Sequence, residues 1–414
     1  MRYSIWYTSL NPIVGGFYGG IFLTLEGLRV LDLTRVLAGP YTTMILCDLG
    51  AEVIKIEEPK KGDEARGIGP FIDGVSAYFL SLNRGKKSIT LNLKKKRGRE
   101  ILLKMCEKAD ILVENFRPGV MARLGLDYHV LKEVNPRLIY AACSGFGQTG
   151  PYAHRGAYDM IIQGMGGIIS ITGEEGMPPV RVGVSIGDIT AAFFTTIGIL
   201  AALYYREKTG KGQMVDVGML DCQVSILENA VIRYLTTGEI PKPLGSRHPS
   251  IAPFEAFPAK DGYVIFAVGS AHWENFCREI GREDLIDDPR FKTNALRSEN
   301  HSILRPIIAE ISRTKTVREW IEKMEKSGVP CGPINTVDKV VNHPQVRERG
   351  MIIEIDHPEV GPVKMAGNPI KLSLSSRNIS QPAPKLGEHT EEVLKSWIGL
   401  DKESIENLRG DGVI

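Results

Sequence analysis

Residues 25–57 read LEGLRVLDLTRVLAGPYTTMILCDLGAEVIKIE, and this stretch decides the fold. The apolar run at 28–33 predicts a strand, and residues 40–49 predict a helix with proline in its first turn and glycine just past its end. Residues 52–56 predict a second strand. A strand, a helix and a strand in this order are typical of a βαβ unit, in which the two strands run parallel.

The same alternation continues along the chain. Further strands are predicted over residues 88–93, 111–114 and 138–143, and helices over residues 97–108 and 128–134. Strands that alternate with helices favour an α/β fold with a parallel sheet covered by helices on both faces. The apolar stretch at 189–205 is at the lower limit of the roughly 17–25 residues that a membrane span needs, so we interpret it as a buried core helix.

The pattern changes after this helix. Residues 213–219 predict a strand, residues 220–235 a helix, and residues 254–268 a hairpin that turns at Lys260-Asp261-Gly262. We therefore divide the chain into an N-terminal extension (1–24), the first part of a large domain (25–210), a smaller α+β domain (211–334) and a C-terminal segment (335–414).

The composition excludes several classes of protein. Of the 414 residues, 43% are hydrophobic and 24% are charged, which argues against disorder and against many membrane spans. The net charge of +2 gives no field that attracts nucleic acid or an anionic membrane, so we expect neither as a partner. The six cysteines are dispersed and the eight histidines lack metal-ligand spacing, which predicts a reducing, cytoplasmic location and no metal site.

Ligands of open parallel sheets bind beyond the carboxyl ends of the strands. Here those ends include Lys94, and Arg123 lies nearby in the sequence, so phosphates can be neutralised there. Charge alone favours the simpler interpretation that the lysines at 94–96 form a solvated helix entrance. Residues 145–150 match G-x-G-x-x-G, but Pro151 follows where a helix would have to begin, so no dinucleotide site is predicted.

Two aspartates stand out by their surroundings. Asp188 opens the apolar helix, where an aspartate is well placed to cap the helix. The same position sets a carboxylate against an apolar wall, where it can act as a nucleophile toward an activated acyl group. Asp159 lies in a glycine-rich stretch and is equally consistent with a turn residue. Position alone leaves these interpretations open, as it does for the nearby His154.

Seven motifs, taken together in their order along the chain, make the functional interpretation more specific. They are residues 25–57, 83–93, 113–119, 144–151, 187–188, 208–213 and 386–394. With them the chain resembles the class III coenzyme A transferases over residues 25–400.

The resemblance implies a Rossmann-like large domain completed by the C-terminal segment, a small middle domain and an interlocked homodimer. It implies that Asp188 attacks an acyl-CoA thioester to give an aspartyl mixed anhydride, and that CoA then passes to a free carboxylic acid. CoA is a substrate in this scheme, and no permanently bound cofactor is expected. The residues that match the family's CoA contacts are Leu37, Ala38, Leu91, Lys94, Asn115, Phe116 and Arg123, and Tyr158 matches a site tyrosine.

The chain departs from the family pattern at several places. The formyl-CoA member carries glutamine at Leu37, tryptophan at Ile68 and a polyglycine loop at residues 245–253, which argues against formyl or oxalate specificity. Glu58 replaces a basic CoA contact, and residues 1–24 have no family counterpart.

Two other functions also stay open. The 2-methylacyl-CoA racemases share this fold but place histidine where this chain has Tyr158, and a phenol with a pKa of about 10 is a poor base. A CoA-binding protein without turnover is the non-enzyme alternative.

Overall fold

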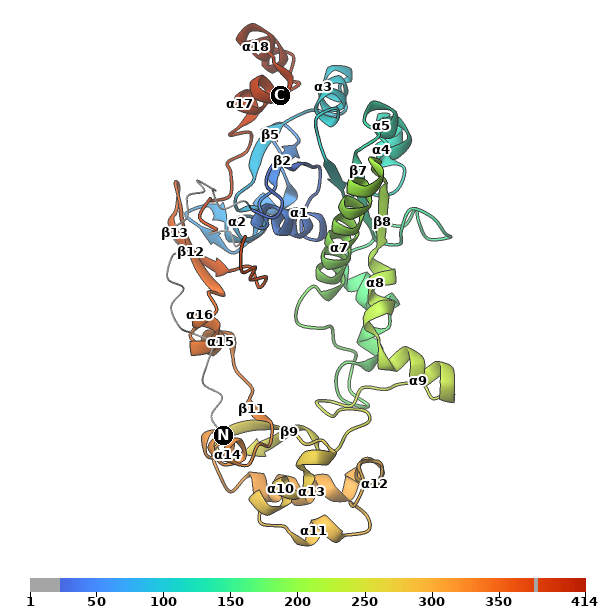
Figure 1. Cartoon of the computed structure of the whole chain (residues 1–414), viewed down its shortest axis with the longest axis vertical. Helices are drawn as coiled ribbons and strands as arrows, with labels where there is room; N and C mark the ends of the chain where they lie inside the picture. Colours follow the sequence, from blue (N-terminus) through green and yellow to red (C-terminus); the bar gives the residue numbers. More distant parts are fainter. Residues whose placement is uncertain (1–22, 376–378) are drawn as a thin grey trace, which may run out of the picture.

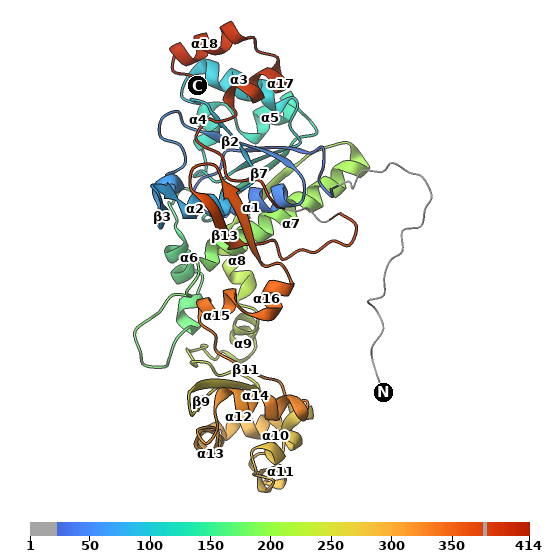
Figure 2. The ribbon, with the colours of Figure 1, turned by 90° about the vertical axis from the view of Figure 1, so that its left-hand side faces the viewer.

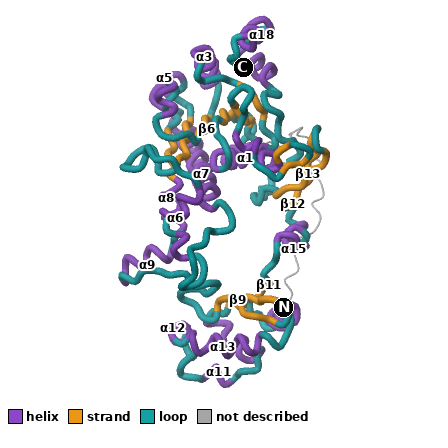
Figure 3. Tube along the Cα trace, turned by 180° about the vertical axis from the view of Figure 1, so that it is seen from behind, coloured by secondary structure: helices purple, strands orange, loops and turns teal. Residues whose placement is uncertain are grey.

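The computed structural model describes residues 23–375 and 379–414 (Figure 1). The predicted extension over residues 1–24 lies outside this part of the chain except at its end. A larger body at one end of the molecule carries the main sheet, and a smaller body lies at the other end (Figure 1). Two separate stretches of chain connect the bodies, and both are visible from the front and from behind (Figures 1 and 3).

The main sheet has six parallel strands in the order β5-β2-β1-β6-β7-β8. They are β1 (Arg29–Asp32), β2 (Glu52–Glu57), β5 (Lys87–Thr90), β6 (Ile111–Glu114), β7 (Ile139–Ser144) and β8 (Met214–Gly218). The strand order reverses direction between β1 and β6, which creates the crevice where sheets of this kind bind ligands. The parallel sheet predicted from the apolar runs is confirmed, although β8 lies beyond the predicted domain boundary at residue 211.

One face of this sheet is covered by α1 (Ala38–Asp48) and α7 (Ile186–Thr209). Leu46 of α1 and Ile199 of α7 pack with Val30 and Ile139 of the sheet in one buried cluster. Among the described residues, α7 alone is long and apolar enough to cross a membrane, and half of its apolar window is buried inside the molecule. It packs between α1 and strands β7 and β8.

The other face is covered partly by the end of the chain. α3 (Lys96–Cys106), α5 (Tyr128–Val134), α17 (Thr390–Ile398) and α18 (Lys402–Gly410) lie together there (Figure 2). Trp397 of α17 and Leu408 of α18 belong to the same buried cluster as Ile54 and Leu112 of the sheet. The C-terminal helices therefore complete the core that the first half of the chain begins.

The smaller body is built on the antiparallel sheet β11-β10-β9, formed by β9 (Phe254–Ala259), β10 (Gly262–Ala267) and β11 (Cys331–Pro333). Helices α10 (Trp273–Glu279), α11 (Asp284–Asp287), α12 (Asn294–Glu299), α13 (His301–Ser312) and α14 (Val317–Lys326) cover it. Its core is aromatic, because the Phe266 ring lies 5.2 to 5.7 Å from the rings of Phe257, Phe276 and Trp320.

The two connections differ from the sequence-based expectation. The single helix predicted over residues 220–235 is two helices, α8 (Met219–Ile226) and α9 (Asn229–Thr237), because the chain turns at Glu228, which has a φ of 47°. The return connection carries α15 (Val337–Val341), α16 (Pro344–Glu348) and the hairpin β12 (Ile352–His357) and β13 (Gly361–Ala366). The shorter elements are α2 (Ala77–Asn83), α4 (Val120–Leu124), α6 (Asp159–Met165), β3 (Phe71–Ile72), β4 (Val75–Ser76) and three 3₁₀ turns, Glu64–Gly67, Ile168–Ile171 and Ser270–His272.

Candidate active site

A cavity of about 480 Å³ opens at the carboxyl ends of β1, β2, β5 and β6. It lies beside the reversal of strand order between β1 and β6, where the fold predicts a ligand. Leu91, Lys94 and Phe116 line the cavity, as do Val120 and Leu124 of the short helix α4. Three of the predicted CoA contacts therefore meet in one place.

The other predicted contacts lie around this cavity. Asn115 is next to Phe116, and its side chain bonds both backbone groups of Arg35, with N···O distances of 2.9 and 2.8 Å. Arg123 is exposed on α4, between two residues that line the cavity. Leu37 and Ala38 are at the start of α1, at the end of the loop that leaves β1.

Two cations at the cavity, Lys94 and Arg35, are paired with carboxylates. Lys94 Nζ lies 2.9 Å from Glu58 Oε1, and this bond lowers the pKa of Glu58 below its usual value. Arg35 pairs with Glu64 at 2.9 Å, and its guanidinium lies 4.7 Å from the centre of the Phe116 ring. An incoming phosphate thus competes with carboxylates that are already in place.

The first turns of α1 and α7 lie side by side. Thr42 Oγ1 donates to the carbonyl of Ala192 at 3.3 Å, and Ala38 shares a buried cluster with Ala191. Since Asp188 is one turn before these α7 residues, the predicted nucleophile and the predicted contacts at the start of α1 are brought to the same end of the two helices.

The side chain of Asp188 has no hydrogen bond or ion pair with any described residue of the chain. Burial raises the pKa of its carboxyl to about 7, and the nearby charge of Asp159 adds to this effect. Asp159 differs, because its two oxygens accept from Gly187 N at 2.8 Å and from Gln163 Nε2 at 2.7 Å. Of the two roles left open for Asp188, the capping of α7 is supplied by Asp159, and the Asp188 carboxylate has no donor among the described residues.

Tyr158, at the N-terminal end of α6, is 74% exposed. Tyr78 of α2 lies near both aspartates: burial and the charges of Asp188, Asp63 and Asp159 raise its pKa to about 12. Sequence reasoning missed Tyr78 because no motif or spacing marks it. His154 is exposed in the turn that follows Pro151.

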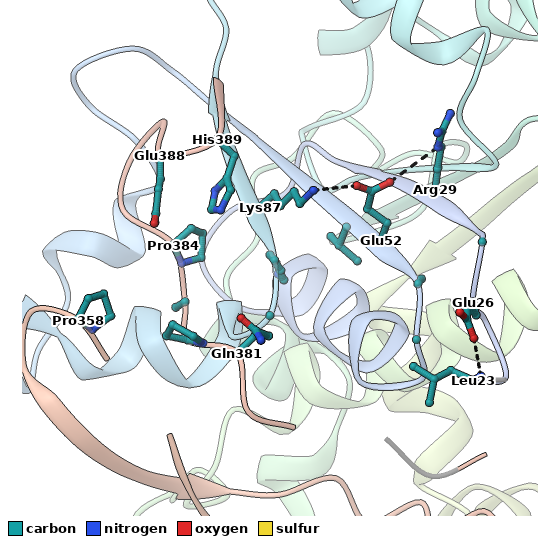
Figure 4. A pocket seen from close by; sticks show the side chains of 18 residues that line it. Leu23, Glu26, Arg29, Glu52, Lys87, Pro358, Gln381, Pro384, Glu388 and His389 are labelled. Carbon is teal, nitrogen blue, oxygen red and sulfur yellow. Dashed lines mark hydrogen bonds and ion pairs between the residues drawn. The ribbon is translucent and has the colours of Figure 1, made fainter. Parts of the chain in front are cut away.

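The opposite edge of the sheet holds a larger hollow of about 750 Å³ (Figure 4). It lies at the amino ends of β1, β2 and β5, and its charged groups pair with one another: Glu52 lies 3.7 Å from Arg29 and 3.2 Å from Lys87. The smaller cavity is the candidate site because it lies at the carboxyl ends of the strands, where parallel sheets bind ligands. No group of three possible metal ligands occurs within residues 23–375 and 379–414.

The model of the CoA-transferase family III matches residues 25–390. The chain belongs to this family. The succinyl-CoA:glutarate CoA-transferase of Mus musculus is 41% identical to this family III CoA-transferase over 94% of the chain and 90% of the mouse protein. The acetyl-CoA:oxalate CoA-transferase of Acetobacter aceti is 45% identical over 90% of the chain and 95% of its own length.

Solved structures agree with this assignment. A CaiB/BaiF family protein from Brucella suis superposes with a TM-score of 0.80 at 40% identity, over 91% of this chain and 99% of that one. The family III CoA-transferase is thus an enzyme that acts on acyl-CoA and transfers CoA to acids. The resemblance found in the sequence motifs is confirmed.

Proposed function

We propose that Asp188 is the nucleophile of this transfer. Its carboxylate oxygen attacks the thioester carbon of the donor, the C–S bond breaks, and CoA leaves as a thiolate from an acyl-aspartyl mixed anhydride. The thiolate then attacks the Asp188 carboxyl carbon, which releases the donor acid and leaves an aspartyl-CoA thioester. The acceptor carboxylate repeats the two steps in reverse and regenerates Asp188, with no net change in protons or electrons.

The surroundings of Asp188 support this role. A carboxylate that lacks hydrogen-bond donors and sits in a largely buried place is a stronger nucleophile than a solvated one, because nothing stabilises its charge. The neighbouring Asp159 carboxylate accepts two N–H donors. Two carboxylates in unlike surroundings take unlike roles. Asp188 reacts, and Asp159 holds the start of α7.

CoA is proposed to bind at the carboxyl edge of the sheet, on Leu37, Ala38, Leu91, Lys94, Asn115, Phe116 and Arg123, with Tyr158 toward the acyl group. The donors and acceptors are proposed to be dicarboxylic acids, because glutarate and oxalate, named in the two relatives, both belong to this class. The racemase alternative lacks support, since no histidine stands at Tyr158 and the nearest one, His154, is exposed.

A donor and acceptor panel tests the function. Purified enzyme is incubated with succinyl-CoA or acetyl-CoA and with dicarboxylic or monocarboxylic acids, and the acyl-CoA products are identified by mass spectrometry. New thioesters of the dicarboxylic acids are expected. Deuterium uptake at the α-carbon of a 2-methylacyl-CoA in D₂O, with no exchange between acids, would establish the racemase instead. Binding without any turnover would favour the CoA-binding alternative.

The pH dependence of kcat/KM tests the nucleophile. Only the ionised Asp188 attacks, and its pKa is raised to about 7. The rate should therefore rise about tenfold per pH unit below 7 and level off above it. In Asp159→Asn the cap to Gly187 is kept but the charge is lost, so the rising limb should move to lower pH. If kcat/KM of the wild type levels off already near pH 4, the assignment is contradicted.

The pairing of Lys94 with Glu58 predicts opposite effects of two substitutions. Glu58→Gln should tighten CoA binding several-fold, because it frees Lys94 and removes a carboxylate from the cavity. Lys94→Ala should weaken binding by up to about tenfold, and the effect should shrink in salt because the pair is exposed. Lys96→Ala, whose lysine pairs with Glu100 and does not line the cavity, is the control. The CoA affinity of each variant is measured by titration calorimetry. Wild-type affinity in all three variants would assign Lys94 to a solvated face.

The chain is also proposed to form a homodimer. The connecting helices α9 and α15 have no buried residue, and Leu235 and Val337 on them are 70% and 78% exposed. Large apolar side chains that are exposed to solvent in this way are typical of a protein–protein interface. Light scattering should give twice the mass of the chain at all dilutions.

A cytoplasmic location remains a proposal. It is supported by the absence of disulfides among the cysteines, all of which lie in the described part of the chain.

A further inference from the structure

The loop between β1 and α1 contains a strained residue. Val36 has a φ of 66°, in the left-handed region that β-branched side chains rarely adopt. Such a conformation persists only where the surrounding structure enforces it, and it gathers at functional sites. The loop ends at Leu37 and Ala38, the proposed acyl-CoA contacts at the start of α1.

Three side chains from other segments hold this loop by its backbone. Asp63 Oδ1 accepts from Val36 N at 3.0 Å. Lys55 Nζ donates to the carbonyl of Thr34 at 2.8 Å, and Asn115 bonds both backbone groups of Arg35. Three consecutive residues are thereby fixed from β2, from the segment after β2, and from the end of β6.

Lys55 and Asp63 also bind each other. Their Nζ and Oδ2 atoms are 2.8 Å apart, and their side chains are 0% and 1% exposed. A buried pair of this kind adds little net stability, because the cost of removing two charges from water offsets their attraction. The pair instead fixes geometry. Because both side chains are shielded from water, they hold the bonded atoms of the loop in place.

The loop also fits closely against α1. A Cβ atom on Gly39 would lie 2.3 Å from Thr34 Cβ, so the first turn of α1 touches the beginning of the loop. The α1 start carries no side-chain cap that would fix it independently. The position of Leu37 and Ala38 therefore depends on the loop.

We propose that Lys55 and Asp63 are positioning residues, a buried clamp that holds Val36 in its left-handed conformation and so presents Leu37 and Ala38 to acyl-CoA. The inference rests on the proposed function, in which these two residues contact the substrate. It assigns to the strain at Val36 a role in substrate binding.

A double-mutant cycle tests the clamp, with CoA itself as the titrant in calorimetry and the KM for succinyl-CoA as a second readout. Asp63→Ala should weaken CoA binding at least tenfold. Val36→Gly/Asp63→Ala should recover most of this loss, because glycine adopts positive φ without a clamp. Val36→Gly alone is measured to complete the cycle.

Asp48→Ala is the matched control. It breaks a pair with Arg84 at 2.8 Å that is similarly buried, with both side chains 3% exposed, but lies away from the loop. It should lower the melting temperature and leave CoA binding unchanged. If Asp63→Ala fails to fold, Lys55→Met/Asp63→Leu replaces it in the same cycle, since it removes the acceptor of Val36 N and leaves no unpaired buried charge.

The outcomes separate a clamp that acts on substrate binding from a purely structural role of Asp63. Equal weakening in Asp63→Ala and in the double variant would show a purely structural role and overturn the clamp, as would wild-type affinity in Asp63→Ala. Wild-type protein that binds no CoA would overturn the proposed function and the clamp together. Rescue by glycine, with the control unchanged, establishes the clamp.

Discussion

Asp188→Asn should lower CoA transfer by at least about three orders of magnitude, because an amide does not attack the thioester. The fold should survive, since the Asp188 side chain makes no bond to the described residues and Asp159 caps α7 from another helix. Transfer is measured with the donor and acceptor pair found in the panel. As a second readout, hydroxylamine should inactivate the wild type only in the presence of acyl-CoA, and should leave the variant unaffected.

The same substitution should stabilise the protein above neutral pH. The folded state raises the pKa of Asp188 from 3.8 to about 7. Between these values the folded state binds a proton that the unfolded state does not, so the wild type loses stability as pH rises through this window, relative to the variant. Above pH 7 the difference is constant. Substantial transfer by the variant, or a lower melting temperature at pH 8, would contradict the assignment.

Lys86→Ala should cost roughly 3–5 kcal/mol in the free energy of unfolding, the usual cost of breaking a buried ion pair from one side. Lys86 Nζ donates to Asp32 at 3.0 Å, to Asn83 at 2.8 Å and to the carbonyl of Pro40 at 3.0 Å. Burial would raise the pKa of Asp32, but the charges of Lys86 and Lys55 lower it to about 2. Without Lys86 the buried carboxylate loses its nearest cation.

The adjacent lysine is a natural control. Lys87 pairs with Glu52 and Glu392, but its side chain is 35% exposed. Lys87→Ala should therefore cost at most about 1 kcal/mol. Both variants are compared with the wild type by urea unfolding. Equal losses would mean that burial of Lys86 does not set the strength of its pairing.

Much of the fold was predictable because it depends on local patterns. The strand at Ile111–Glu114 and the helix at Tyr128–Val134 have the predicted bounds, since apolar runs and turn residues mark them in the sequence. The break at Glu228 was not predictable, because no glycine or proline marks it. The place of α17 on the sheet was not predictable either, because it depends on packing with residues far away in the chain.

The candidate site was predictable in its residues and not in their pairing. Motifs selected Lys94 and Asp188, but the partner of Lys94 is Glu58, 36 residues away, and Asp159 reaches Gly187 across 28 residues. The first contact arises because the parallel strands β2 and β5 align their ends, and the second because α6 packs against α7. Tyr78 was missed for the same reason, since only the fold brings it near the aspartates.

The place of α17 and α18 on the main sheet affects how the chain is made. Their buried residues Trp397 and Leu408 cover strands that are synthesised about 300 residues earlier. During synthesis the apolar face over Ile54 and Leu112 has only α3 and α5 to cover it, while the smaller body is still emerging from the ribosome. The large body therefore finishes folding last, and a nascent chain stalled before α17 should be a preferred client of chaperones that bind exposed apolar strands.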